Sequence, residues 1–228
     1  MSLQELYLQW FGGYADFITT KCLLNMENQQ LYQERQRVIL IVFLTYILPV
    51  LLVFLEVIPF SWRFYVLIFA AIVVAAIAYL YRFSPVELGF TNKNLKKSLT
   101  AIALPTLIFT GLMFIYYLTH GSRLDNSAYQ WLFYLFFVSL SSPIQEFLYR
   151  GFLFAIFKRA KFATWVQIIL SSLLYSFVHL IYKDILTLVF TLIIGMIWGW
   201  NYAKFRNLYS IIIIHSLLGA IAILVGLV

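Results

Sequence analysis

Charged residues and cysteines are scarce in this sequence. Only 11% of the 228 residues are Asp, Glu, Lys or Arg, and Cys22 is the single cysteine. One cysteine can form neither an internal disulfide nor a cysteine-based metal cluster. Soluble domains average about 25% charged residues, so the low charge content argues against a soluble protein. The short length leaves room for one helical bundle and for no second soluble domain.

Apolar residues take the place of the missing charges. They make up 63% of the chain, and aromatic residues alone make up 19%. Soluble proteins contain about 45–50% apolar residues, and a soluble core of this size cannot hide such an excess. We therefore expect an all-α, polytopic transmembrane protein, in which lipid-facing and interfacial positions account for the many Tyr and Phe side chains.

Seven segments are long and apolar enough to cross a membrane, which takes about 20 residues of helix. Their predicted ranges are 37–56, 62–82, 98–119, 128–158, 162–182, 184–204 and 207–227. The fourth segment is long for one crossing and contains Pro143, which can kink or divide a helix. Eight spans are therefore the alternative, if this segment breaks or if the N-terminal residues enter the membrane.

The net charge of +7 comes from basic residues in the short loops between the apolar segments. This distribution indicates membrane topology and not nucleic-acid binding, because short basic loops face the cytoplasm. If the N-terminus is cytoplasmic, the outer loops hold only Arg63, Arg123 and Lys183, and Arg150 lies within a helix. The other twelve of the 16 basic residues are then cytoplasmic: Lys21, Arg35, Arg37, Arg82, Lys93, Lys96, Lys97, Lys158, Arg159, Lys161, Lys204 and Arg206.

The N-terminal residues differ from the rest of the chain. We predict a separate segment over residues 1–36, which shows no cleavable signal peptide, and a helical bundle over residues 37–228. Apolar residues recur in the first segment at roughly helical spacing, which favours an amphipathic helix on the cytoplasmic membrane surface. Packing of this helix on the bundle is the alternative. The expected location is the cytoplasmic (inner) membrane of a bacterium.

Four ionisable side chains stand out within the predicted spans, where charge is costly unless it is paired or faces a wet cavity. They are Glu146, Arg150, His179 and His215. Glu146 and Arg150 are four residues apart, so they share a helical face and can form an ion pair. A purely structural pair is one interpretation, but it leaves two of the three histidines unexplained. We therefore predict one shared polar site.

These side chains suit hydrolysis by activated water. A carboxylate near imidazoles can take a proton from water, and a histidine or the arginine can stabilise the oxyanion that forms. The serines of the spans have no intramembrane Asp with which to form a catalytic triad. We expect no cofactor. Zinc bound by Glu146, His179 and His215 is the alternative, because these residue types bind zinc but their spacing differs from that of a zinc-protease helix.

The order of these residues resembles the CPBP family, which contains CAAX proteases and bacteriocin-processing enzymes and is also called Abi. The similarity covers roughly residues 84–220. Each motif is short, but the ordered set within membrane spans is fairly specific. The similar segments are Glu87 to Phe90 (the family's ELGF), Gln145 to Arg150 (EExxxR), Tyr175 to His179 (FxxxH) and His215 to Gly219 (HxxxN or HxxxD).

The resemblance implies a glutamate-dependent intramembrane endopeptidase. Its substrate would be a membrane-associated peptide or a protein tail, with or without a lipid modification, and its other partner is the lipid itself. By resemblance, Glu146 and His179 activate water, and His215 helps to bind the oxyanion. Arg150 orients the carboxylate.

Three positions depart from the family's motifs. Gln145 replaces the first glutamate and counts among the catalytic candidates, although an amide cannot act as a base and Glu146 must take that role. Tyr175 replaces Phe and Gly219 replaces Asn or Asp, and both are candidates for substrate binding. The substitutions at positions 145 and 219 favour an alternative, an inactive relative that binds a membrane partner as an immunity or assembly factor. A transporter with a Glu-His proton relay is disfavoured, because no inverted repeat is visible.

Overall fold

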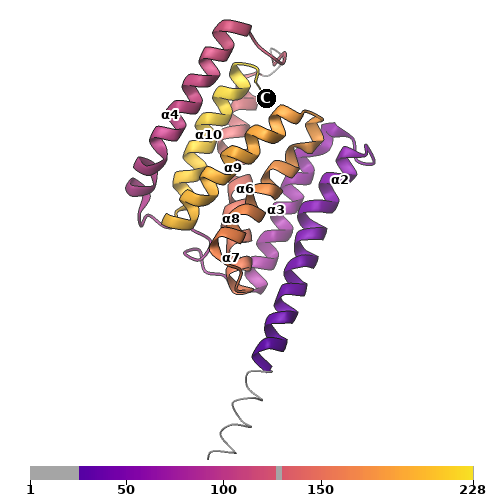
Figure 1. The fold of residues 1–228 in the computed structure, drawn as a ribbon. Coiled ribbons are helices and arrows are strands. Elements are labelled where there is room, and N and C mark those ends of the chain that lie inside the picture. Colours follow the sequence, from indigo (N-terminus) through magenta and orange to yellow (C-terminus); the bar gives the residue numbers. More distant parts are fainter. Residues whose placement is uncertain (1–25, 127–129, 228) are drawn as a thin grey trace, which may run out of the picture. The chain divides into compact units, whose positions relative to one another are not determined.

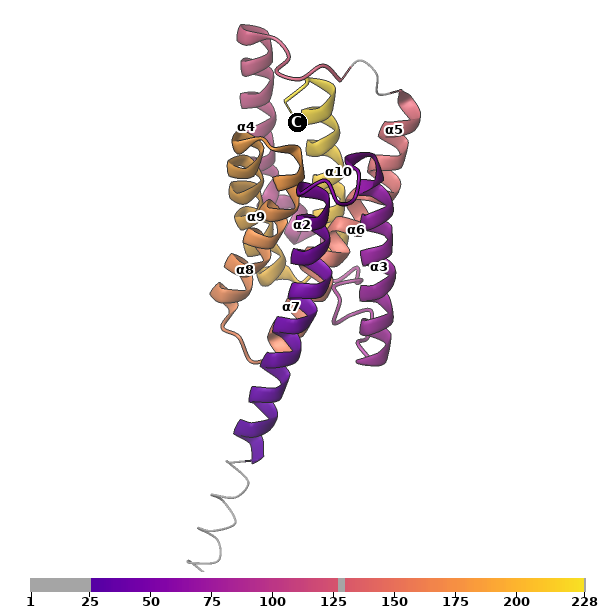
Figure 2. The ribbon, with the colours of Figure 1, turned by 90° about the vertical axis from the view of Figure 1, so that its right-hand side faces the viewer.

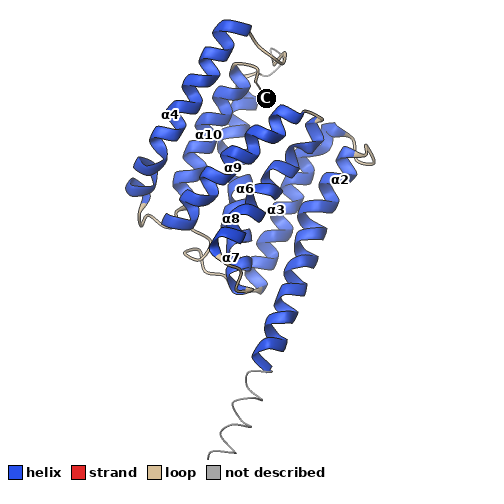
Figure 3. Ribbon diagram, in the orientation of Figure 1, coloured by secondary structure: helices blue, strands red, loops and turns tan. Residues whose placement is uncertain are grey.

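The structure is a computed structural model that describes residues 26–126 and 130–227. All regular elements within these ranges are helices, and none is a strand (Figure 3). Lipid offers no hydrogen-bond partners to the backbone, whereas a helix satisfies its own backbone groups. The all-helical architecture confirms the predicted fold class.

Within the described residues, six helices are long and apolar enough to cross a membrane, and one further apolar helix is shorter. Their number confirms the prediction of about seven spans, and each lies within or overlaps one predicted segment. Figures 1 and 2 show Leu95–His120 running beside Leu208–Leu224. The long helices are Met26–Phe54, Phe60–Leu80, Leu95–His120, Trp131–Arg159, Thr164–Tyr182 and Ile185–Phe205, and the short one is Leu208–Leu224.

Several spans consist of shorter elements, because the type of helical turn changes along them. The turns η1, η3 and η4 are π-helical, and η2 and η5 are 3₁₀ turns. In chain order the elements are η1 (Phe43–Ile47), α2 (Leu48–Phe54), η2 (Phe60–Trp62), α3 (Arg63–Leu80), α4 (Leu95–His120), α5 (Trp131–Phe136), η3 (Phe137–Ser141), α6 (Ser142–Glu146), η4 (Phe147–Phe152), α7 (Leu153–Arg159), α8 (Thr164–Phe177), η5 (Val178–Tyr182), α9 (Ile185–Phe205) and α10 (Leu208–Leu224).

The chain divides into two compact units, Met1–Leu40 and Ile41–Val228. The described part of the first unit is helical, and Arg37 Nη1 lies 2.8 Å from Glu34 Oε1 on its surface. Residues 1–25, which include Cys22 and most of the predicted amphipathic segment, lie outside the described residues. The surface helix therefore stays a prediction.

The fourth span, Trp131–Arg159, is one continuous helix, so Pro143 does not divide it. Pro143 lies in the first turn of α6, directly after the π turn η3. A π turn is wider than an α turn, and it accommodates a residue that lacks an N–H and crowds the preceding turn. The second half of this helix forms the core of the bundle, where Phe152, Leu153 and Phe154 have no exposed surface.

The loops that follow α3, α7 and α9 meet at one end of the bundle. Leu208 N at the start of α10 donates to Gly89 O at 2.9 Å. Arg159 Nη1 donates to Tyr81 O at 2.7 Å, just beyond the end of α3. These loops and the adjoining helix ends carry nine of the 16 basic residues. The arrangement therefore agrees with the predicted alternation of basic and non-basic loops.

The remaining loops meet at the opposite end. Lys183 Nζ forms an ion pair with Glu56 Oε1, and this hydrogen bond lowers the pKa of the exposed Glu56 carboxyl. Arg123, in the loop after α4, contacts both carboxylate oxygens of Asp184, which caps the N-terminus of α9. Which of the two ends faces the cytoplasm stays a prediction.

Asn207 joins α10 to the loop after α3. Its Oδ1 accepts a hydrogen bond from Ser210 N at 2.9 Å and so caps the helix. Its Nδ2 donates to the carbonyl oxygens of Thr91 and Lys93, at 2.6 and 2.8 Å. Asn207 is fully buried, so each of these bonds replaces a contact with water. This residue fixes where α10 begins, two helical turns before His215.

We expect Asn207→Ala to destabilise the bundle by about 2–3 kcal/mol, because it removes a helix cap and leaves two loop carbonyls without a donor. Thermal and denaturant unfolding in detergent micelles measures the change. Asn92→Ala, at an exposed position of the same loop, is the control and should stay within about 0.5 kcal/mol of the wild type. Equal stabilities of the two variants would contradict this role of Asn207.

Candidate active site

Glu146 and Arg150 form an ion pair in the core of the bundle. Glu146 is the last residue of α6, and Arg150 lies in the π turn η4. Arg150 Nη1 is 3.1 Å from Glu146 Oε1, and neither side chain has any exposed surface. The pair that the four-residue spacing predicts is therefore formed. A buried pair is stable only when further hydrogen bonds satisfy its remaining polar atoms.

His215 supplies a second donor to the same carboxylate oxygen. It lies in α10, and its Nδ1 is 2.6 Å from Glu146 Oε1. An ionised carboxylate only accepts hydrogen bonds, so Nδ1 carries a proton and donates it. In a neutral imidazole the other nitrogen, Nε2, then has the free lone pair. Nε2 faces the hydroxyl of Tyr175 at a long 3.4 Å.

Aromatic rings enclose the charged groups. The guanidinium carbon of Arg150 lies 4.2 Å from the ring centre of Tyr175 and 5.5 Å from that of Trp198. Trp198 also lies against His215, with the ring centres 4.8 Å apart. A cation over an aromatic face is attracted by the ring's quadrupole, most strongly where water is absent. These contacts help to offset the cost of burying Arg150.

His179 lies beside this cluster but not on the carboxylate. It belongs to the 3₁₀ turn η5, and its Nδ1 is 2.8 Å from the backbone oxygen of Tyr175. Its ring packs edge-to-face on the ring of Tyr175, with centres 5.1 Å apart. His179 is half-buried, whereas Glu146 and Arg150 are completely buried. It is the most accessible of the four ionisable groups predicted for the site.

Two of the three substituted motif positions, 145 and 219, lie at the edge of the cluster. Gln145 Nε2 donates to Ser141 Oγ at 3.0 Å, one turn back along the same helix. Gly219 lies in α10 against Phe137, and a Cβ atom at Gly219 would be only 2.5 Å from the Phe137 ring. The ring of Phe137 therefore occupies the place of a larger side chain at position 219.

Two polar atoms of the ion pair have no hydrogen-bond partner among the described residues. They are Glu146 Oε2, an acceptor, and Arg150 Nε, a donor. Both are completely buried, and an unpaired buried polar atom is costly. The ion pair is thus incompletely satisfied, and one small polar ligand that both donates and accepts would suit the two atoms.

Sequence reasoning missed the contribution of α9. Gly195 O lies 3.4 Å from Arg150 Nη2, and a Cβ atom at Gly195 would be 3.3 Å from both Ser172 and Tyr175. The absence of a side chain lets α8 and α9 approach closely and brings Trp198 onto His215. The spacing of Gly195 and Gly199 is the small-xxx-small pattern typical of tightly packed membrane helices. This pattern is visible in the sequence and could have indicated α9.

No group of three His, Cys, Asp or Glu side chains within residues 26–126 and 130–227 is placed to hold a metal ion. The zinc alternative required Glu146, His179 and His215 to converge. These three side chains do not form such a group within the described residues, so the structure gives the zinc alternative no support.

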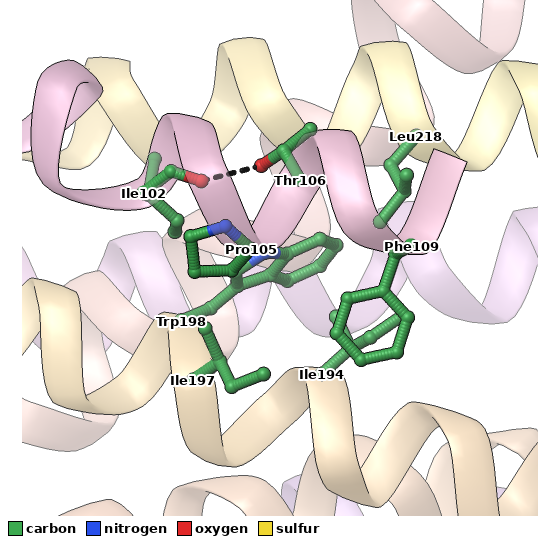
Figure 4. Close-up of a pocket in the computed structure, with 8 residues that line it drawn as sticks. All are labelled: Ile102, Pro105, Thr106, Phe109, Ile194, Ile197, Trp198 and Leu218. Atoms are coloured by element: carbon green, nitrogen blue, oxygen red, sulfur yellow. Dashed lines mark hydrogen bonds between the residues drawn. The ribbon is translucent and has the colours of Figure 1, made fainter. Parts of the chain in front are cut away.

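A small apolar pocket lies on another side of Trp198, between α4, α9 and α10 (Figure 4). Its volume is about 10 Å³, close to the minimum for one water molecule. Pro105 and Trp198 point into it from facing helices (Figure 4). The other lining residues are Ile102, Thr106, Phe109, Ile194, Ile197 and Leu218. An apolar lining of this kind favours a dry pocket, so Trp198 separates apolar space from the charged cluster.

The fold and the cluster together define a polytopic helical membrane protein with a buried carboxylate–imidazole site. Residues 125–221 match the family described as type II CAAX prenyl endopeptidase Rce1-like. This range contains every predicted site residue, and the match confirms the resemblance to CAAX proteases. Comparisons with curated proteins and with solved structures found no match. The spanning helices indicate an integral membrane protein, and residues 125–221 of it are similar to CAAX-type endopeptidases.

A double-mutant cycle should reveal the energetic coupling of Glu146 and Arg150. Glu146→Gln and Arg150→Met each leave one buried charge unpaired, which costs about 3–5 kcal/mol. The double variant should be more stable than the sum of the two losses predicts, because no unpaired charge remains. Unfolding in micelles measures all three variants.

The exposed pair Glu34–Arg37 is the matched control for this cycle. It is also a close Glu–Arg pair on one helix, but exposed pairs contribute less than about 1 kcal/mol. Glu34→Gln and Arg37→Met should therefore have small and additive effects. Additive losses at Glu146 and Arg150 would show that the two charges are not coupled.

Proposed function

We propose that the protein is an intramembrane endopeptidase that cleaves a membrane-associated peptide or protein tail by water activation at Glu146. One observation carries this proposal. The ion pair leaves one acceptor, Glu146 Oε2, and one donor, Arg150 Nε, without a partner among the described residues. Hydrolysis of a peptide bond needs both, since an acceptor must take a proton from water and a donor must bind the oxyanion.

In this proposal Glu146 Oε2 takes the proton as the water oxygen attacks the peptide carbonyl carbon. The carbonyl oxygen becomes an oxyanion, and Arg150 Nε donates a hydrogen bond to it. When the intermediate collapses, the C–N bond breaks and the proton passes to the leaving amine. Arg150 Nη1 and His215 Nδ1 hold Glu146 Oε1 and so orient the carboxylate. His179, the most accessible of the four groups, accepts the proton that the new carboxylic acid product releases.

The oxyanion role expected for His215 has less support from the geometry than the same role for Arg150. His215 already uses its Nδ1 proton on Glu146, and its Nε2 faces the Tyr175 hydroxyl. Arg150, in contrast, keeps its Nε–H without a partner in the described part of the chain. The sequence reasoning left the oxyanion to a histidine or the arginine, and we propose the arginine.

The burial of the site favours a second candidate function. Glu146 and Arg150 have no exposed surface, and two donors already hold one carboxylate oxygen. A protein with this closed cluster could bind a membrane partner without cleaving it. Catalysis in turn requires the surrounding side chains to move, so that water and a peptide reach Glu146 Oε2.

A comparison of membrane peptidomes distinguishes the two functions. Cells that express the wild type are compared with cells that express Glu146→Asp, which keeps the charge but shortens the side chain, and His179→Ala. His120→Ala is the matched control, because His120 lies at the exposed end of α4. If a set of cleaved termini disappears in both site variants and persists in the control, the protein is a protease. If equally abundant variants leave every terminus unchanged, the binding function replaces it.

Gln145 provides a sharper test of which residue is the base. Since its side chain bonds Ser141 and not the ion pair, we expect Gln145→Ala to change the cleavage rate by less than about threefold. Glu146→Asp should lower kcat by about 100-fold, the lower end of the contribution of a general base. A purified protein in lipid bilayers and a substrate from the peptidome give both rates. A larger loss in Gln145→Ala than in Glu146→Asp would assign the reaction to position 145.

A further inference from the structure

Tyr175 contacts every ionisable group of the candidate site except Glu146. Its hydroxyl faces His215 Nε2, and its backbone oxygen accepts from His179 Nδ1. Its ring lies under the guanidinium of Arg150 and packs against both imidazole rings. Any aromatic side chain at position 175 can make the ring contacts, but only tyrosine supplies the hydroxyl.

The hydrogen bonds of the two histidines determine where each carries its proton. A backbone carbonyl only accepts, so His179 must donate through Nδ1. The Glu146 carboxylate also only accepts, so His215 must donate through Nδ1. Both neutral rings are therefore Nδ1–H tautomers with a lone pair on Nε2. In each ring the acceptor that Nδ1 contacts fixes the proton on Nδ1 and so leaves the lone pair on Nε2.

The Nε2 atoms of the two rings have different surroundings. At His215 the Tyr175 hydroxyl is placed to donate to Nε2. At His179, Nε2 has no hydrogen-bond partner within the described part of the chain, and the side chain is half-buried. The site thus contains one imidazole lone pair that is already occupied and one that is open.

We infer that Tyr175 is a positioning residue that occupies Nε2 of His215 through its hydroxyl and holds His179 through its backbone oxygen, so that His179 Nε2 is the open imidazole base of the site. The assignment of the tautomers rests on the geometry alone. The kinetic consequence rests on the proposed endopeptidase function. In the cleavage reaction His215 then holds the Glu146 carboxylate in place, and His179 accepts and releases protons.

Nitrogen-15 NMR of the imidazole rings in lipid nanodiscs tests the tautomers without any activity. The chain has three histidines, and the variant His120→Gln leaves only His179 and His215 to assign. We expect both rings to be protonated on Nδ1, with the Nε2 resonance of His215 shifted by a hydrogen bond and that of His179 not shifted. A proton on Nε2 of either neutral ring would overturn the inference, whether or not the protein is a protease.

Tyr175→Phe keeps the ring and the backbone oxygen and removes only the hydroxyl. We expect it to move the Nε2 resonance of His215 and to leave the resonances of His179 in place. Tyr149→Phe is the matched control, because Tyr149 is equally buried and packs edge-to-face on Tyr175. This control should move neither Nε2 resonance. The inference is wrong if Tyr175→Phe leaves the His215 resonance unchanged.

The kinetic consequence is measured on the cleavage reaction. Loss of one neutral hydrogen bond that positions the site should lower kcat of Tyr175→Phe by about tenfold with KM unchanged, and Tyr149→Phe should keep the wild-type kcat. An unchanged kcat in Tyr175→Phe would overturn the kinetic role. If no substrate is cleaved although the tautomers are as expected, the protease proposal fails and the positioning of the histidines stands.

Discussion

The buried carboxylate of Glu146 is the constraint on which the polar interior depends. An ionised group without exposed surface is stable only beside donors that replace its hydration. The structure supplies Arg150 from the next turn and His215 from α10, and both act on the same oxygen. The burial of Arg150 in turn requires the faces of Tyr175 and Trp198. One charge on α6 thus determines the neighbours that α8, α9 and α10 provide.

The π turn η4 next to Glu146 requires partners of its own. Widening the helix disturbs the regular backbone bonds, and free carbonyl groups cannot be left unpaired in a membrane. Tyr46 donates its hydroxyl to Leu148 O at 2.9 Å, and Ser171 donates to Tyr149 O at 2.7 Å. Side chains from two other spans thereby stabilise the irregular turn that carries Arg150. Changes at these distant positions act on the site through the backbone of η4.

The large features of the fold could be predicted from the sequence because they follow from composition and spacing. Hydropathy is sufficient for seven spans, and a separation of four residues is sufficient for the pairing of Glu146 with Arg150. The arrangement of the histidines could not be predicted. At about 1.5 Å per residue, counted from the cytoplasmic ends of the predicted helices, His179 would lie about 9 Å deeper in the membrane than Glu146. The sequence also does not show that Tyr175 lies beside both histidines.

Other parts of the site depend on contacts between helices, which no linear pattern specifies. The π turns around Pro143 and Arg150 leave no clear sequence signal, and the approach of Trp198 to His215 depends on the packing of α9 against α8. The aromatic replacement at position 175 looks like a mild departure from the motif. In the structure it is the residue that adds a hydroxyl to the cluster.

The close contact of Gly219 with Phe137 has a consequence for the evolution of such sites. The two residues lie on different spans, and the ring of one fills the volume that a side chain on the other would need. Neither position can therefore change alone without a steric clash or a void. A lineage that gains an amide or carboxyl group at position 219 must first, or at the same time, reduce the residue at position 137. The two positions should covary in related sequences, and a comparison of motif residues one by one would overlook this dependence.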